Sequence, residues 1–403
     1  MMRVDRAARR AAYALAGCVA AIAVAACGGS GSTQVARVSI GALVAQTGAA
    51  APIGTEQLQA IRLAVDRINA AGGVGGTKLN LLVADSRSDP VDATAGMRSL
   101  IGQGVVAVLG PTLSLSAVGA DPVANQLHTP VISISNTAPR IVGRCAYACE
   151  WIWRDSLGAV RTTTANVQTL LRDQAVSSAA LLSSSSDILA ASESATAAAA
   201  FRAGGTRIAS NVTLPPPGGN RSSVAHDVAV ALRSRPEALF VSSSDGNEVA
   251  QVVRLARADG FRGEILAGDV LNATEATRLA GGADRGVQTG AAWYIGNDFP
   301  ANISFVRTFA GAYGDEPDQF AAQAYVGIQI LTQAIVRGGA RAGGLTVAQR
   351  RSAVQEGLGQ VALTTPLGPF RFTANHDVDQ IAWIIQGDGR GGHRLVAFCN
   401  PGC

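Results

Sequence analysis

Short apolar runs alternate with longer segments of helical periodicity through most of this chain of 403 residues. The apolar runs have the composition of strands and cover 37–44, 79–84, 105–109, 131–134, 179–182, 207–212, 238–241 and 264–266. Segments of helical spacing lie between them, at 55–71, 89–102, 116–127, 159–171, 221–233 and 247–259. Strand followed by helix, repeated, predicts parallel sheets with right-handed crossovers. Because a single open sheet of this many strands is unusual, we predict an α/β fold with two doubly wound parallel-sheet lobes.

The N-terminus has the pattern of an export signal. Four arginines precede an apolar run at 11–26, which is shorter than the roughly 20 residues that span a bilayer. Small residues lead into Cys27, and this ending resembles a lipoprotein lipobox. The resemblance implies a signal peptide at 1–26 and a lipid on Cys27, with a flexible Gly/Ser tether at 27–35. An uncleaved membrane anchor is the alternative, although no stop-transfer flank follows.

Charge and cysteine usage narrow the class of protein. The formal net charge is +4, and the single lysine, Lys78, and the scattered arginines form no basic stripe, so a nucleic-acid partner is not expected. Four cysteines remain beyond Cys27, in two pairs with the same short spacing: Cys145, Cys149, Cys399 and Cys403. An even count in an oxidising compartment favours disulfides, and we prefer the local pairs to long-range bridges. A four-thiolate metal site is the alternative, but its usual two-residue spacing is absent.

Five predicted strand-to-helix turns carry hydroxyl groups. They are the segments 110–116, 135–139, 183–187, 242–246 and 268–270, and only the last three contain carboxylates. Ligands of open parallel sheets sit at these turns, where helix N-termini offer free N–H groups. Hydroxyl-rich turns favour an anionic group and a buried Asp favours a cationic one, so a zwitterion between the halves would satisfy both. Ordinary helix capping is the alternative for each single turn.

Signatures of enzymes are missing from the sequence. It contains no Gly-x-Ser-x-Gly elbow, no phosphate loop ending in Lys-Ser or Lys-Thr and no His-Glu-x-x-His, and its four histidines are isolated. We therefore expect a binding protein with no catalytic residues, no cofactor and no metal. The tail after residue 319 differs from the alternating part, because it predicts helices at 319–336 and 347–356 and short strands at 370–372 and 381–385.

The segments 38–43, 64–74, 83–90, 108–111, 130–133, 257–260 and 365–370 together resemble the type I periplasmic binding proteins of the branched-chain amino acid transport family. The resemblance covers residues 36 to about 388, and its Ile-Asn-Ala-x-Gly-Gly stretch at 68–73 is fairly specific. It implies two lobes joined by a three-segment hinge with crossings near Asp155, Gln288 and Asp379. Lobe 1 would hold 36–155 plus 289–379, and lobe 2 would hold 156–288 plus 380–403.

The resemblance also implies roles for turn residues. Ser114 matches a serine that meets the ligand carboxylate, Thr137 a threonine that meets the amino acid backbone, and Asp269 an acidic partner for the ammonium. Ser135 and Asn136 belong to the same predicted site. The chain departs from the family pattern where Ile53, Ile188 and Asp245 replace aromatic residues of the side-chain pocket. These departures argue against leucine, isoleucine or valine and favour a more polar or cationic solute. Trp293 and Tyr294 are candidate replacement aromatics, and packing at the hinge is the alternative for both.

These expectations combine into one hypothesis. The protein would be a monomeric, extracytoplasmic solute-binding protein held at the cell membrane by its lipid alone. It would bind a small polar solute, such as an amino acid or amide, by hinge closure and deliver it to an ABC permease. A surface sensor of the same fold, which signals to a receptor without transport, is the alternative.

Overall fold

The computed structural model describes residues 37–143, 145, 148–216 and 220–400. The predicted signal peptide at 1–26, the tether at 27–35 with its lipidation site Cys27, and Cys403 lie outside the described residues. Within the described ranges, no helix is long and apolar enough to cross a membrane.

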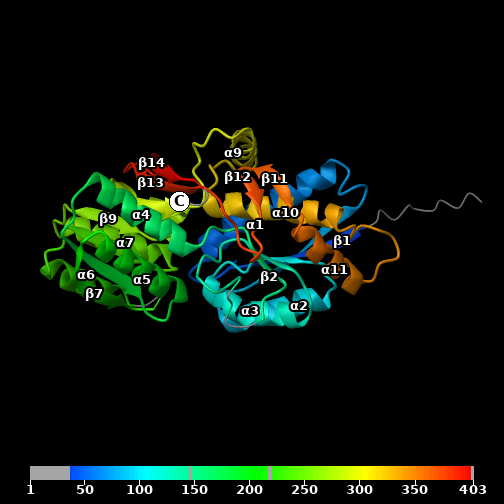
Figure 1. The fold of residues 1–403 in the computed structure, drawn as a ribbon, viewed down its shortest axis with the longest axis horizontal. Helices are drawn as coiled ribbons and strands as arrows, with labels where there is room; N and C mark the ends of the chain where they lie inside the picture. Colours follow the sequence, from blue (N-terminus) through cyan, green and yellow to red (C-terminus); the bar gives the residue numbers. More distant parts are fainter. Residues whose placement is uncertain (1–36, 144, 146–147, 217–219, 401–403) are drawn as a thin grey trace, which may run out of the picture. The chain divides into compact units, whose positions relative to one another are not determined.

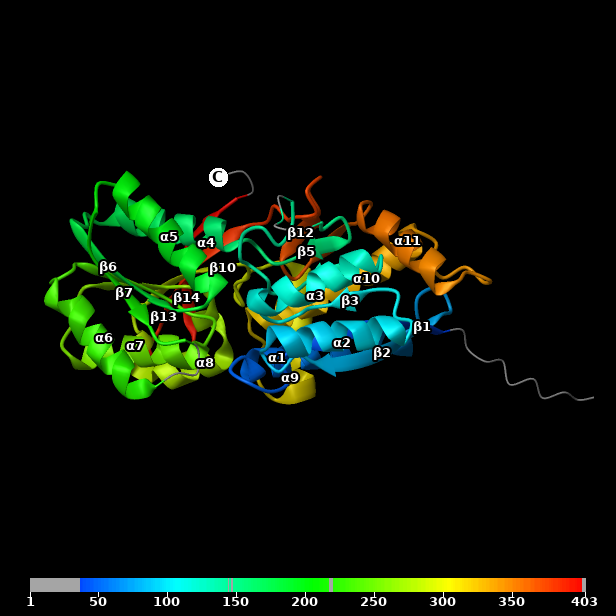
Figure 2. The same cartoon turned by 90° about the horizontal axis from the view of Figure 1, so that it is seen from below.

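The first lobe is built on a five-stranded parallel sheet. Its strands are β1 (Arg37–Val44), β2 (Lys78–Asp85), β3 (Val108–Leu109), β4 (Val131–Ser133) and β5 (Ile152–Arg154), in the order β2-β1-β3-β4-β5. The helices are α1 (Ala51–Ala70), α2 (Pro90–Gly102), α3 (Ser114–Gln126), α9 (Pro300–Tyr313), α10 (Gln319–Arg337) and α11 (Val347–Leu358). Helices α2 and α3 cover one face of the sheet, and α1 and α10 cover the other (Figure 1); Figure 2 shows the layer of α2 and α3 from the front. Strands β3 and β4 are entirely buried, as expected for parallel strands between two helical layers.

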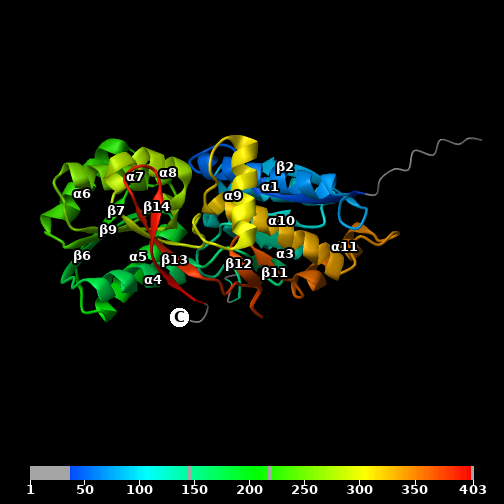
Figure 3. The same ribbon diagram turned by 90° about the horizontal axis from the view of Figure 1, so that it is seen from above.

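The second lobe is built on a seven-stranded sheet. Its strands are β6 (Ser178–Ser184), β7 (Arg207–Leu214), β8 (Ala238–Ser242), β9 (Glu264–Ala267), β10 (Gln288–Ala291), β13 (Ala382–Gly387) and β14 (His393–Cys399), in the order β14-β13-β10-β9-β8-β6-β7. Its helices are α4 (Ala159–Asp173), α5 (Ile188–Ala203), α6 (Arg221–Arg233), α7 (Gly246–Ala258) and α8 (Thr274–Ala280), with short 3₁₀ turns η1 (Asp269–Asn272) and η2 (Gly281–Asp284). Helices α4 and α5 lie on one face, and α6, α7 and α8 lie on the other (Figure 3).

The predicted α/β fold with two parallel-sheet lobes is confirmed, with two local differences. The predicted strand at 105–109 is reduced to Val108–Leu109. The tail adds β13 and β14 as an antiparallel edge beside β10, because the chain returns to this sheet from the other side and then folds back as a hairpin. A separate hairpin of β11 (Ala362–Thr365) and β12 (Gly368–Arg371) precedes it.

The chain passes between the two sheets three times, and two ion pairs hold the third passage. Arg154, at the end of β5, donates from Nε to Asp377 Oδ1 at 2.9 Å and forms a salt bridge with the same carboxylate through Nη2. Two residues further along the third passage, Asp379 pairs with Arg161 of α4. The third passage is therefore fixed to the first lobe at Asp377 and to the second lobe at Asp379.

The structure joins Cys145 to Cys149, the local disulfide preferred from the sequence. Cys399 is also disulfide-bonded, whereas its preferred partner Cys403 lies outside the described residues. Replacing Cys145 and Cys149 together by serine is expected to lower the free energy of unfolding by about 2 kcal/mol, because a short cross-linked loop removes little entropy from the unfolded chain. Denaturant unfolding measures this, with Ala148→Ser in the same loop as the matched control. A loss no larger than that of the control would contradict it.

Candidate functional site

The candidate site lies where the carboxyl ends of strands from the two sheets face each other. Thr137 follows β4 of the first lobe and Asp269 follows β9 of the second lobe. The Thr137 hydroxyl lies close enough to the Asp269 carboxyl to lower its pKa. Neither Thr137 Oγ1 nor Asp269 Oδ1 has a hydrogen-bond partner within the described part of the chain, and both side chains are buried. Two buried polar groups from opposite lobes thus lie close together, and neither satisfies the hydrogen-bonding capacity of the other.

The first-lobe wall consists of hydroxyl and amide groups. Ser114 begins α3, and its Oγ accepts a hydrogen bond from Ala138 N at 3.3 Å. Asn136 is fully buried, and neither its side-chain nitrogen nor its oxygen has a partner among the described residues. Arg154 Nη1 donates to the carbonyls of Asn136 at 3.3 Å and Ala138 at 3.0 Å. Arg154 therefore holds the turn that presents Thr137.

Ser135, by contrast, is occupied within the first lobe. Its Oγ accepts from Gln57 Nε2 at 2.7 Å and donates to the Thr112 carbonyl at 2.6 Å. Gln57 Oε1 in turn accepts from Thr112 Oγ1 at 2.7 Å. This closed network gives Ser135 a structural task in the turn, since a hydroxyl has a single proton to donate.

The second-lobe wall consists of carboxyl groups. Asp187 caps α5, accepting from Leu189 N at 3.0 Å, and also accepts from Ser244 N at 2.6 Å. Asp245 caps α7 by accepting from Asn247 N at 2.9 Å. These caps explain why two of the predicted acidic turns start helices, since Asp is a preferred N-cap residue.

Two further acids, Glu193 and Glu248, complete this wall. Glu193 lies inside α5, where its carboxylate accepts from Ser242 Oγ and from Asp269 N, the latter at 3.4 Å. Glu248 lies in the first turn of α7 and accepts from Ser184 Oγ. Both side chains are buried. Neither acid was predicted from the sequence, because both lie within helices and not in turns, although Glu193 is the single acidic residue of α5.

Burial and like charge both act on these acids. Burial is the main cause that raises the pKa of Asp269, to about 7, and the negative charge of Asp187 raises it further. Burial likewise raises the pKa of Glu193 well above its usual value, with Asp269 and Asp187 adding to the effect. The pKa of Glu248 is raised by burial and by Asp245 and Asp187. Asp187, Glu193, Glu248 and Asp269 form no ion pair among the described residues.

The hydrophobic candidates differ in their surroundings. Ile53 belongs to the buried core of the first lobe, and Ile188 is partly exposed at the start of α5. Trp293 is buried, with its Nε1 donating to Asn302 Oδ1 at 2.7 Å, and Tyr294 packs against Trp383. Packing thus accounts for both aromatic residues.

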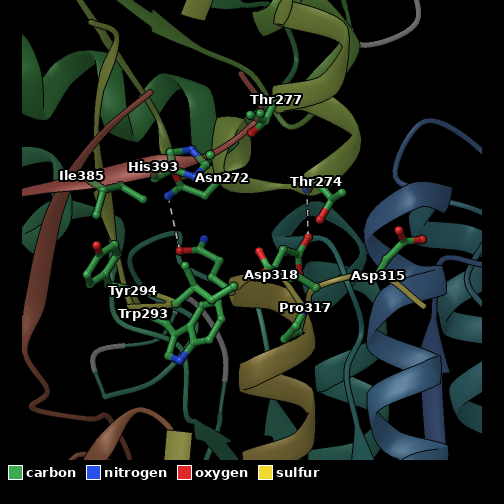
Figure 4. Close-up of a pocket in the computed structure, with 15 residues that line it drawn as sticks. Asn272, Thr274, Thr277, Trp293, Tyr294, Asp315, Pro317, Asp318, Ile385 and His393 are labelled. Carbon is green, nitrogen blue, oxygen red and sulfur yellow. Dashed lines mark hydrogen bonds between the residues drawn. The ribbon is translucent and has the colours of Figure 1, made fainter. Parts of the chain in front are cut away.

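A cavity of about 260 Å³ lies beside Trp293 and Tyr294 (Figure 4). Its walls come from η1 and α8 of the second lobe and from the start of α10. Across it, Asn272 Nδ2 donates to Gln319 Oε1 and Thr274 N donates to Asp318 Oδ2, each at 3.3 Å. Asp269, Thr137 and Ser114 are not among its lining residues, so this cavity is separate from the meeting point of Thr137 and Asp269.

Comparison with known proteins places this architecture. The fold matches that of the leucine-binding protein LivK from Thermotoga maritima with a TM-score of 0.80 at 21% identity, over 90% of this chain and 99% of that one. It also matches a solute-binding protein of an ABC transporter from R. palustris, solved with benzoate, with a TM-score of 0.78 at 21% identity, over 91% of this chain and 97% of that one. These likenesses identify a type I periplasmic binding fold.

The family model for periplasmic binding proteins matches residues 37–392, and the chain therefore belongs to this family. The family consists of solute-binding proteins and not of enzymes. An amino acid binding protein of Pseudomonas aeruginosa is 32% identical over 127 residues, which are 31% of this chain and 34% of that protein. The alignment thus spans about a third of that curated relative.

Proposed function

We propose that this protein is the substrate-binding component of an ABC importer, which binds a small polar solute between its lobes. The observation that carries the proposal is the meeting of Thr137 and Asp269 from opposite sheets, each buried and each with an unpartnered oxygen. Unpaired buried polar groups are costly unless they gain a partner. A ligand at this position would supply that partner to both lobes at once.

The proposed mechanism is hinge closure between lobe 1, at 36–155 plus 289–379, and lobe 2, at 156–288 plus 380–403. A ligand gains the contacts of the second lobe only in the closed form, and it therefore shifts an open-closed equilibrium toward closure. Ser114, Asn136 and Thr137 would face the ligand from lobe 1, and Asp269 and Asp245 from lobe 2. Ile188 and Ser135 would border the site. A permease would then recognise the closed monomer.

The proposed location is the outer face of the cell membrane. The signal pattern at 1–26, the lipobox ending at Cys27 and the tether at 27–35 support a lipid-anchored protein that needs no membrane span of its own. Radiolabelled fatty acid should enter the wild-type protein and not Cys27→Ser. Label in the Cys27→Ser protein would remove this residue as the lipidation site.

A ligand screen tests the binding function. The full-length chain, purified in mild detergent, is heated with amino acids, amides, amines and small carboxylates, one at a time. A ligand present at 100 times its dissociation constant stabilises a protein by about 2.7 kcal/mol, which gives a clear rise in melting temperature. Uptake of the identified ligand by cells should then depend on this gene. Ligand binding without any effect on uptake would favour the sensor and contradict the transport role.

A further inference from the structure

We propose that the ligand is an organic cation of net positive charge, an ammonium or guanidinium compound, and that Glu193 and Asp269 together form the subsite for its cationic group. This inference rests on the proposed function, because it places the ligand in the same cleft. It adds Glu193, which helix α5 carries, to the residues expected from the sequence. It also sets the sign of the ligand's charge.

The backbone brings the two carboxyls together at one turn. Glu193 Oε1 accepts from the backbone N–H of Asp269 at 3.4 Å, and Ser242 Oγ donates to Glu193 Oε2. A Cβ atom at Gly268 would lie 2.1 Å from Glu193 Oε2, so a larger residue at this position would push the carboxylate away from the turn. The second lobe is therefore shaped to hold Glu193 against the residue that carries the other acid.

The first lobe gives an independent indication that a ligand binds beside Asp269. Thr137 Oγ1 is buried, faces Asp269 and has no hydrogen-bond partner within the described residues, and Asp269 Oδ1 is also unpartnered there. The Thr137 hydroxyl is near enough to the Asp269 carboxyl to lower its pKa, but the two groups do not have the geometry of a hydrogen bond. A donor from a ligand, placed between them, would pair with the carboxylate oxygen and with the hydroxyl.

The balance of charge indicates what that ligand carries. Glu193 and Asp269 have Asp187 close by, and Glu248 has Asp245 and Asp187 as charged neighbours. On the first lobe, Ser114, Asn136 and Thr137 are neutral. Arg154 lines a pocket with Thr137, but its charge is paired with Asp377. Buried charges require opposite charges or hydrogen bonds. The single ammonium group of a zwitterion can neutralise only one carboxylate. A site with several carboxylates therefore fits a ligand that carries more positive than negative charge. Among the described residues no three His, Cys, Asp or Glu side chains are arranged to hold a metal ion.

Proton release follows from this arrangement. In the free protein, the pKa of Asp269 is raised to about 7 and that of Glu193 is raised well above its usual value, by burial and by neighbouring carboxyls. A bound cation stabilises the ionised forms and lowers both pKa values. Binding near neutral pH should therefore release protons, and the affinity for the cation should increase as the pH rises from about 5 to about 8.

Calorimetry with the full-length chain tests the inference. The probes are arginine, agmatine, 1,4-diaminobutane, leucine and benzoate, each titrated at neutral pH in two buffers that differ in ionisation enthalpy. At least one of the three cations should bind about 100-fold more tightly than leucine and benzoate, with proton release. Glu193→Gln should weaken that cation about 10- to 100-fold and reduce the proton release, because a charge-assisted hydrogen bond is lost. Asp259→Asn, which removes a carboxylate at the far end of α7, is the matched control and should bind like the wild type.

The outcomes separate this inference from the proposed function. If leucine or benzoate binds as tightly as the cations and Asp269→Asn abolishes that binding, the cleft binds solutes but the cationic ligand is excluded. If none of the three cations binds at millimolar concentration, the inference is overturned. If a cation binds and neither Glu193→Gln nor Asp269→Asn weakens its binding, the binding site lies elsewhere. Both the inference and the placement of the ligand between the lobes are then wrong. Melting temperatures of the variants show that each is folded.

Discussion

Asp269→Asn should abolish the thermal stabilisation that a bound ligand gives, while the ligand-free variant remains at least as stable as the wild type. The amide keeps the shape of the carboxyl but has no charge to pair with an ammonium or guanidinium group. Loss of the carboxylate charge should weaken binding about 100-fold. The ligand-free protein does not need this charge, because Asp269 is buried among carboxyls and forms no ion pair within the described residues.

The pH dependence of the ligand-free proteins follows from the raised pKa of Asp269. This pKa is about 7 in the folded protein and 3.8 in the ordinary state, so between these values the folded state binds more protons than the unfolded state. The contribution of Asp269 to stability therefore falls as the pH rises from about 4 to about 7 and is constant outside this window. Above pH 7, Asp269→Asn should exceed the wild type in stability by up to about 4 kcal/mol, since one pKa unit corresponds to about 1.4 kcal/mol.

Melting temperatures measured from pH 4 to 8, with and without ligand, check both parts. The wild type should lose stability relative to Asp269→Asn as the pH rises, and the two should converge near pH 4. Asp259→Asn, with its exposed carboxyl, should follow the wild type. If Asp269→Asn keeps the full ligand-induced shift, Asp269 does not belong to the binding site.

Arg154→Met is expected to lower the free energy of unfolding by about 3 kcal/mol. Arg154 is buried, pairs with Asp377 and donates to the carbonyls of Asn136 and Ala138. Breaking a buried ion pair typically costs about 3 to 5 kcal/mol, and the lower value applies because the Asp377 side chain is 32% exposed. The Thr137 turn loses its support in this variant, so ligand affinity should fall as well.

Denaturant unfolding measures the stability, and a second arginine gives the matched control. Arg172 pairs with Asp173 on the surface, where the two side chains are 62% and 50% exposed, and Arg172→Met should cost less than about 0.5 kcal/mol. A loss of less than about 1 kcal/mol in Arg154→Met would mean that the Asp377 pair and the Thr137 turn do not depend on this side chain.

The sequence was sufficient for the parts of the fold that depend on periodicity. Alternating strands and helices predicted both parallel sheets, because such strands are buried on both faces and appear as short apolar runs. The antiparallel pairing of β13 and β14 was not predicted. Residues 395–399 of β14 form a short apolar run, but such a run reveals neither the partner strand nor the direction of pairing. Strand β3 is shorter than its apolar run, although the run still lies against β1: Val106 N donates to the Ser39 carbonyl at 2.8 Å, and the Ala107 carbonyl accepts from Gly41 N at 2.9 Å. The regular pairing of β3 with β1 is confined to Val108 and Leu109.

The candidate site was predictable only where its residues occupy turns. Thr137 and Asp269 follow strands of different sheets, and ligands of such sheets sit at the carboxyl ends of the strands, so a site between the two halves could be anticipated. Glu193 and Glu248 lie inside helices, where an acid normally faces water, and their burial depends on how α5 and α7 pack. The one feature of the sequence that could have indicated Glu193 is that it is the single acid in α5, a helix made mostly of small, apolar residues. Ser135 was predicted as a site residue, but the structure shows that its hydroxyl is bonded to Gln57, and this pairing could not be predicted from the sequence.

The two ion pairs of the third passage also mark where this passage changes from one lobe to the other. Arg154 fixes Asp377 to the first lobe, and Arg161 fixes Asp379 to the second. Val378, between them, is buried in the core of the first lobe and forms a β-bridge with Phe372. The change of lobe therefore falls between Val378 and Asp379, and in the proposed hinge closure this passage would turn at that single peptide link.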